Sequence, residues 1–345
     1  RDPRQRGAAH PPFYKNKWSS MNMNSKQRVI AVLEGKTPDC TPAGFSLHFP
    51  VEESAGQAGV ESHGRFLRET HVDILKVMNE NLVPDVGEVK TPADWQKVCD
   101  ICRDDTFIRR QLDFAKRVLD SCADAQAFAL GTLHGIVASG IHPYEASYGY
   151  DGARTLQVTH LRENPAPVLE AFKRITERMC QLARGYAEIG MDGVYYAALG
   201  GETCWFTDEE FDRWVRPFDQ EILSEIRGSG RYAFLHICKH RLNMQRYACY
   251  APCCDAVNWG VYEAPLSMDE GCRLFAGKAI MGGLANRSGC MVEAGQEELN
   301  AEGVRLAKKY GPEKYILGAD CTLPTEIPYE RIRALTDAVH EATRQ

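Results

Sequence analysis

Short apolar runs and longer amphipathic stretches alternate along this chain of 345 residues. A short apolar run bounded by turn residues or charged residues is typical of a buried strand. Eight such runs follow one another, at residues 42–49, 72–78, 127–132, 193–198, 232–238, 256–259, 279–283 and 315–319. The pattern therefore predicts eight buried strands.

The stretches between these runs carry helix signals rather than hairpin turns. After Asn164, Pro165 opens a segment whose apolar residues recur every three or four positions until Gly190, which is typical of an amphipathic helix. The capping box of Ser or Thr followed three positions later by Glu begins further helices at residues 207–210 and 267–270. The chain therefore alternates strand and helix.

That alternation favours one architecture. Asn24 or Ser25 caps a first short helix, and the last two helices are predicted over residues 296–309 and 329–342. Strands that alternate with helices form a parallel sheet, and eight is the number that closes into a barrel. The alternative is an open doubly wound sheet, but no Gly-rich turn follows residues 42–49. We predict an α/β protein with a single (β/α)8 TIM barrel.

The first residues are excluded from this barrel. Residues 1–20 mix Arg, Pro and Gly without periodicity and contain no apolar core, so they are predicted to be a non-native or disordered leader. The barrel is predicted over residues 21–345, with Met21 or Met23 as the natural beginning.

Composition excludes several classes of partner. The formal net charge of -6 gives no electrostatic reason to expect nucleic acid or an anionic membrane. No apolar run approaches the roughly 20 residues that a membrane span needs. Thirteen cysteines without a repeated spacing fit a reducing compartment better than a disulfide scaffold. We expect a soluble cytoplasmic protein.

Two predicted strands end in residues that bind metals. His236 and Cys238 point the same way from the end of the fifth strand, because side chains alternate between the two faces of a strand. Cys321 follows the eighth strand. Active residues of these barrels lie at the carboxyl ends of strands, so the three side chains are expected to meet there.

Three protein ligands with one open position are typical of catalytic zinc, whereas structural zinc is closed by four ligands. A thiol is the natural occupant of the open position, since zinc would hold it as a thiolate able to attack an activated methyl group. The alternative is that His236 is a hydrogen-bonded core residue and that Cys238 and Cys321 only pack.

The sequence resembles a known superfamily at residues 28–35, 73–80, 235–238 and 316–324. These segments are similar to the uroporphyrinogen decarboxylase superfamily, and more narrowly to its zinc-dependent methyltransferase branch, which moves methyl groups between a corrinoid protein and a thiol such as coenzyme M. The most specific part is the His-x-Cys pair with the distant Cys.

The resemblance implies zinc (Zn²⁺) at His236, Cys238 and Cys321, and a methylated corrinoid such as methylcobalamin, on a partner protein or as a co-substrate. It implies a small-molecule thiol as the methyl acceptor. Two alternatives stay open. One is a decarboxylase of a porphyrinogen-like acid, although residues 44–49 lack the arginines that would grip its carboxylates. The other is a protein that binds a corrinoid or tetrapyrrole without turning it over.

The remaining candidates concern the surroundings of the metal. Glu202, after the fourth strand, is predicted as a fourth ligand displaced by substrate, or else as a loop carboxylate. Asn258, Trp259 and Tyr196 are predicted to wall the substrate pocket. Further histidines stand near other predicted strand ends, where each alone is more often structural, and they are His48, His134 and His142.

Overall fold

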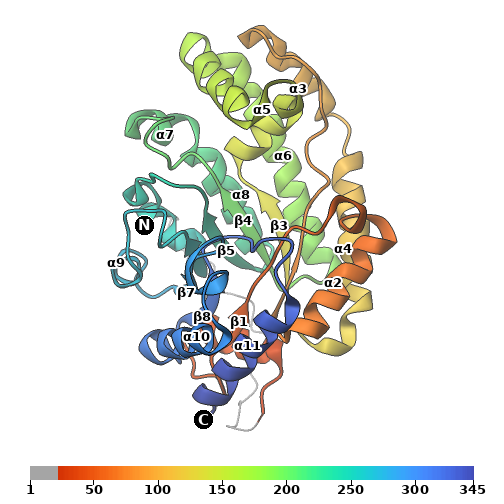
Figure 1. The fold of residues 1–345 in the computed structure, drawn as a ribbon. Helices are drawn as coiled ribbons and strands as arrows, with labels where there is room; N and C mark the ends of the chain where they lie inside the picture. The colour runs from red at the N-terminus through yellow and green to blue at the C-terminus, as the bar shows by residue number, and fades with distance from the viewer. Residues whose placement is uncertain (1–21) are drawn as a thin grey trace, which may run out of the picture.

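The structure is a computed structural model that describes residues 22–345, so the leader predicted for residues 1–20 and a start at Met21 lie outside the described part. Eight strands form one sheet, with helices arranged around it (Figure 1). The strands are β1 (Ala43–Gly44), β2 (Ile74–Val77), β3 (Phe128–His134), β4 (Gly193–Ala198), β5 (Tyr232–Ile237), β6 (Ala256–Trp259), β7 (Ala279–Leu284) and β8 (Tyr315–Ala319).

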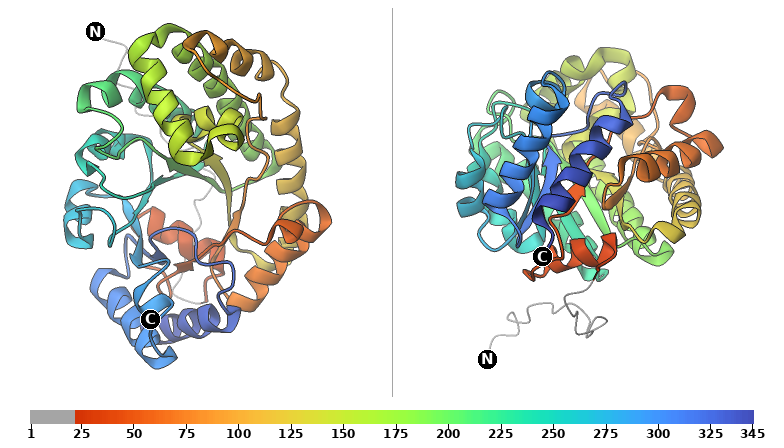
Figure 2. Two further views of the ribbon diagram at one scale, coloured as in Figure 1. Left: turned by 45° about the horizontal axis from the view of Figure 1, so that its top comes forward. Right: turned by 60° about the horizontal axis from the view of Figure 1, so that its bottom comes forward.

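All seven strand ladders are parallel, in the order β1-β8-β7-β6-β5-β4-β3-β2, and the sheet curls into a nearly closed barrel. The predicted (β/α)8 barrel is therefore confirmed. Its last helix packs against its first large one, with the Tyr329 ring 5.2 Å from the Phe66 ring and perpendicular to it. The right-hand view of Figure 2 shows the C-terminal helix, in dark blue, beside the early helices in orange.

The α-helices of the described residues are α1 (Ser25–Leu33), α2 (Gly56–Thr70), α3 (Gln96–Ile101), α4 (Thr106–Ser121), α5 (Ile136–Glu163), α6 (Pro165–Ile189), α7 (Asp208–Trp214), α8 (Arg216–Gly228), α9 (Met268–Leu274), α10 (Gln296–Tyr310) and α11 (Tyr329–Thr343). Asn24 caps α1, and both predicted capping boxes are present at α7 and α9. Helix α5 was not predicted, and it is interrupted at Gly149, where φ is 68°. None of the helices in residues 22–345 combines the length and the apolar character needed to cross a membrane.

The first strand is much shorter than the predicted residues 42–49. β1 pairs with β8 only, and Asp73 bridges the open seam to β2, because Ala43 N donates to its carboxylate at 2.8 Å. The apolar residues after β1 are buried for another reason. Phe49 packs against the ring of His63 in α2, 4.7 Å away. Apolar character here reflects contact with a helix rather than strand pairing.

Side chains fill the lower part of the barrel. Alternate residues of the strands point inward and pack together with α1, which covers the N-terminal end of the barrel. This inner cluster includes Val29, Ile30, Val32, Leu33, Ile74, Phe128, Leu130, Tyr195, Phe234, Met281 and Ile316. The remaining open space lies at the C-terminal end, where active sites of this fold are built.

Candidate metal centre

The three predicted metal ligands meet at the C-terminal end of the barrel. His236 lies in β5, Cys238 directly follows it, and Cys321 follows β8. One nitrogen of His236 and the two sulfur atoms lie within 4.8 Å of one another. Zinc lies about 2.0–2.3 Å from nitrogen and sulfur ligands, so one ion can contact all three atoms with small side-chain adjustments.

Asn258 fixes the orientation of the His236 ring. Its amide nitrogen donates to the carbonyl oxygens of Met281, at 2.8 Å, and Ala319, at 3.0 Å. Its Oδ1 must therefore face the other way, where the Tyr195 hydroxyl lies 2.8 Å away and His236 Nδ1 lies 2.6 Å away. Because Oδ1 can only accept, Nδ1 carries the proton and Nε2 keeps its lone pair.

The free nitrogen is the one that a metal needs. His236 is 2% exposed, and within residues 22–345 its Nε2 has no hydrogen-bond partner. A buried polar atom without a partner costs about 1–3 kcal/mol, so such atoms are rare unless a ligand completes them. Metal-bound histidines characteristically donate their other nitrogen to an oxygen, as His236 does to Asn258. The donor set therefore fits a zinc ion.

The two sulfur atoms are electrostatically unequal. The thiol of Cys238 interacts with the sulfur of Cys321, which lowers the pKa of Cys321 well below its ordinary value and raises the pKa of Cys238. The ammonium of Lys76 favours the thiolate of Cys321 as well. Because the thiolate is the form that binds metals, the lowered pKa of Cys321 favours the binding of a cation at its sulfur.

Lys76 of β2 was not identified from the sequence. Its ammonium lies 3.9 Å from the centre of the Tyr195 ring, inside the barrel. Burial lowers the pKa of Lys76 to about 8, and the nearby sulfurs of Cys321 and Cys238 oppose that change. The sequence feature that could have identified Lys76 is its position as the single lysine in the apolar run 72–78. Alternation places its side chain on the same face as Ile74, which points into the barrel.

A cavity of about 350 Å³ opens above the three ligands. It is lined by His48, Lys76, Met78, Thr132, His134, Ala138, Ile141, His142, Glu145, Tyr150, Tyr195, Ala197, Leu199, His236, Cys238, Lys239, Cys321 and Thr322. Pockets for small organic ligands usually begin at about 300 Å³. The cavity is therefore large enough for a small molecule bound next to the sulfurs.

Imidazole rings line the side of the cavity formed by β3 and α5. The rings of His134 and His142 are perpendicular, with their centres 5.1 Å apart. Burial lowers the pKa of His134 to about 3 and that of His142 to about 4, so both rings are neutral near pH 7. His48 makes a hydrogen bond of 3.1 Å with Glu80 at the rim. These three histidines share one cavity with the sulfur atoms.

The structure corrects the prediction that Glu202 is a metal ligand. Its Oε1 accepts a bond of 2.9 Å from the buried Arg154, and its Oε2 accepts one of 2.9 Å from the Gly200 N–H. The carboxylate is 3% exposed and is not among the groups that converge with the sulfurs. Glu202 instead fixes the loop after β4, because both of its oxygens are engaged there.

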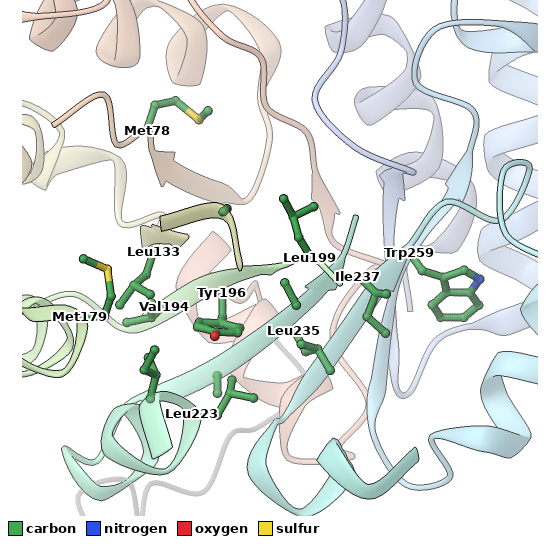
Figure 3. Close-up of a cluster of buried hydrophobic side chains, with 14 of the residues drawn as sticks. Met78, Leu133, Met179, Val194, Tyr196, Leu199, Leu223, Leu235, Ile237 and Trp259 are labelled. Carbon is green, nitrogen blue, oxygen red and sulfur yellow. The ribbon is translucent and has the colours of Figure 1, made fainter. Parts of the chain in front are cut away.

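The prediction for the pocket wall is corrected too. Tyr196 points into the layer between the sheet and the helices, beside Leu223, and donates to Asp219 of α8 (Figure 3). Trp259 also points outward and donates to the Leu266 carbonyl at 3.0 Å. Neither side chain lines the cavity, because each is on the outward face of its strand.

Residues 145–342, more than half of the chain, match the sequence profile described as uroporphyrinogen decarboxylase (URO-D). No curated protein matches the chain. Among solved structures, a methyltransferase from Methanosarcina mazei is similar with a TM-score of 0.72 and 13% identity, over 93% of this chain and 99% of that one. At this identity the similarity establishes the fold alone.

A B12-independent methionine synthase from Shewanella sp. W3-18-1, in complex with selenomethionine, is a more distant match. Its TM-score is 0.45 and its identity is 14%, over 67% of this chain and 65% of that one. The score is too low to support a conclusion about either protein.

Proposed function

The chain belongs to the uroporphyrinogen decarboxylase family, and we propose that it is a zinc-dependent methyltransferase. It moves a methyl group between a methylated corrinoid and a thiol, and zinc is held by His236, Cys238 and Cys321. The observation that carries the proposal is the convergence of these three ligand atoms, with His236 Nε2 buried and unpartnered within the described residues. The similarity in fold to the Methanosarcina methyltransferase adds support.

Each residue has a defined part in this chemistry. When bound, zinc lowers the pKa of a substrate thiol and holds it as a thiolate. Asn258 keeps the His236 ring in the tautomer that can bind, and the cavity leaves room for the thiol at the remaining position. Zinc held by His236, Cys238 and Cys321 would present the substrate sulfur as a nucleophile at the base of the cavity, and the methyl group of the corrinoid would be the electrophile that this sulfur accepts.

Cavity size suggests how the corrinoid takes part. A volume of about 350 Å³ suits a small thiol, whereas a corrinoid macrocycle is far larger. We therefore propose that the corrinoid is presented over the cavity by a partner protein, with only its methyl group reaching the sulfur. The open C-terminal end of the barrel is the face that such a partner would cover.

The lining of the cavity argues against decarboxylation of a porphyrinogen. None of the described residues that line it is an arginine, and its only formal cations are Lys76 and Lys239. A substrate with many carboxylates needs several bidentate donors, which only arginine supplies. A protein that only binds a corrinoid would not need an open metal position, so turnover separates this alternative from the proposal.

Metal analysis tests the ligand set. We expect about one zinc per chain in the wild type, loss of zinc in Cys238→Ser and in Cys321→Ser, and full zinc in Cys272→Ser, whose thiol is exposed and far from the cavity lining. Methyl transfer from methylcobalamin to thiols should follow the zinc content. Full retention of zinc in both variants would refute the site. A zinc-loaded protein that methylates no thiol would favour the binding role.

A further inference from the structure

The cavity contains a carboxylate that has no partner within residues 22–345. Glu145 of α5 lines the cavity, and no described residue makes an ion pair or a hydrogen bond with its side chain. Glu145 is half-buried, whereas the buried Glu202 is fully engaged by Arg154 and Gly200. A partly desolvated charge without a partner is energetically unfavourable, so a cation bound beside Glu145 would stabilise this wall of the cavity.

Two neutral imidazoles stand beside that carboxylate. His142 and Glu145 are three residues apart on α5, so they share one face of the helix. The His134 ring lies against His142, with centres 5.1 Å apart. A neutral imidazole keeps one nitrogen lone pair, which can accept a hydrogen bond from an ammonium group. This wall therefore offers one negative charge and two neutral acceptors.

A cation lies on another side of the same cavity. Lys239 directly follows Cys238 and takes a left-handed conformation with φ of 81°, which is unusual for a residue other than glycine. Its ammonium lies 4.3 Å from the centre of the Tyr150 ring, and no described carboxylate forms an ion pair with it. The strained backbone brings a positive charge to the edge of the ligand set.

We propose that the methyl acceptor is an amino-acid thiol, whose ammonium group binds Glu145 with His134 and His142 and whose carboxylate binds Lys239. The inference rests on the proposed function, since the sulfur of the same molecule must occupy the open metal position. A thiol with only an acidic group would leave Glu145 unpaired. A thiol with only an amine would leave Lys239 unpaired. A zwitterion satisfies both charges at once.

Thiol binding can be measured without any methyl donor. The zinc is replaced by cobalt(II), whose absorption changes when a thiolate sulfur binds, and the spectrum is titrated with four thiols. Homocysteine carries both groups, 3-mercaptopropionate the carboxylate, cysteamine the amine and 2-mercaptoethanol neither. We expect homocysteine to bind roughly tenfold more tightly than either thiol with a single charged group, since it makes one more charge-assisted bond. 2-Mercaptoethanol should bind most weakly.

Two substitutions assign the charged groups. Glu145→Gln should weaken homocysteine and cysteamine by about tenfold and leave 3-mercaptopropionate unchanged. Lys239→Met should weaken homocysteine and 3-mercaptopropionate and leave cysteamine unchanged. Matched controls are Glu163→Gln, at the far end of the same helix, and Lys308→Met, on the exposed surface of α10. Both should leave all four affinities unchanged.

Each outcome supports or overturns one proposal. Equal binding of all four thiols by the wild type, or an equal loss for all four in Glu145→Gln, overturns the amino-acid thiol while leaving the methyltransferase in place. A cobalt spectrum that no thiol changes overturns the proposed function, and the acceptor with it. Because the panel is first measured on the wild type, the result does not depend on whether a variant folds.

Discussion

Asp73 and His236 are buried at opposite ends of the barrel, and they differ in whether their polar atoms have partners. At the N-terminal end, Asp73 is inaccessible and its carboxylate is bound by Arg28, by His340 at 2.8 Å and by the Ala43 N–H at 2.8 Å. At the C-terminal end, His236 Nε2 and Asp320 Oδ1 are equally buried, yet neither has a hydrogen-bond partner among residues 22–345.

This difference separates stability from function. A buried carboxylate with three partners holds elements together, and Asp73 joins α1, β1 and α11 across the open seam of the sheet. A buried atom without a partner weakens the fold, so the position of His236 Nε2 next to two sulfurs fits a site that a ligand completes. The proposed chemistry therefore lies at the opposite end of the barrel from Asp73.

The largest effect is expected from Asp73→Ala, at the N-terminal end. Removing the carboxylate leaves the Ala43 N–H without its acceptor and Arg28 with Asp39 and the Met23 carbonyl, so the free energy of unfolding should fall by about 3–5 kcal/mol. Urea unfolding of the metal-free protein measures this. Asp337→Ala, which removes an exposed partner of His71, is the control and should cost under about 0.5 kcal/mol. The metal affinity of folded Asp73→Ala should match the wild type; a large loss would show that the two ends are coupled.

At the C-terminal end, Asn258 provides a sharper test. Asn258→Leu removes the acceptor for His236 Nδ1 and should weaken zinc binding by about 10–100-fold. Asn258→Asp keeps an acceptor, although it loses the donors to Met281 and Ala319, and should bind zinc within a few-fold of the wild type. Competition with a chelator measures both affinities. Equal affinity in the two variants would mean that Asn258 does not orient the ligand.

The smallest effect concerns pH. Burial raises the pKa of Asp219 to about 7, and its partners are neutral donors, the hydroxyls of Tyr196 and Tyr250 and the Ile136 N–H. A pKa raised on folding means that the protonated form is favoured in the folded state, so stability is lost as pH rises from about 4 towards 7. From about pH 5.5 to 6.5 the wild type should lose at most about 1.4 kcal/mol relative to Asp219→Asn.

Unfolding curves at the two pH values provide the measurement. Asp73 should behave in the opposite way: although burial alone would raise its pKa, the bonds from His340 and Arg28 bring it below the ordinary value. Its contribution is therefore lost as pH falls. Parallel pH profiles for the wild type and Asp219→Asn would contradict the assignment of a raised pKa.

The fold could be predicted from the sequence because the short apolar runs mark the segments that are buried. All eight strands lie within or overlap the predicted runs, and the caps at Asn24, Thr207 and Ser267 are where the sequence places them. Only the length of the first predicted strand was wrong, because an apolar run indicates that a segment is buried and does not show which element buries it. Phe49 packs against α2, a contact that is known only from the tertiary structure.

The candidate site was predictable where one strand sets the geometry. His236 and Cys238 share a face of β5, and this follows from alternation alone. The outward orientation of Tyr196 does not follow from alternation alone, because both faces of a barrel strand are buried and apolar content does not distinguish them. It becomes clear only from the register, in which Ala197 pairs with the inward His236. Glu202 was misassigned because its partner Arg154 lies in α5, and no local pattern reveals that contact.

Helix α1 has a kinetic consequence. It seals the base of the barrel with Val29, Ile30, Val32 and Leu33, so in the described chain the cavity is a blind pocket with its entrance at the C-terminal face. If a corrinoid protein sits over that entrance, the acceptor has to arrive before it, and the methylated product has to wait until it leaves. Under the proposed function, this architecture would impose a compulsory order of arrival and departure.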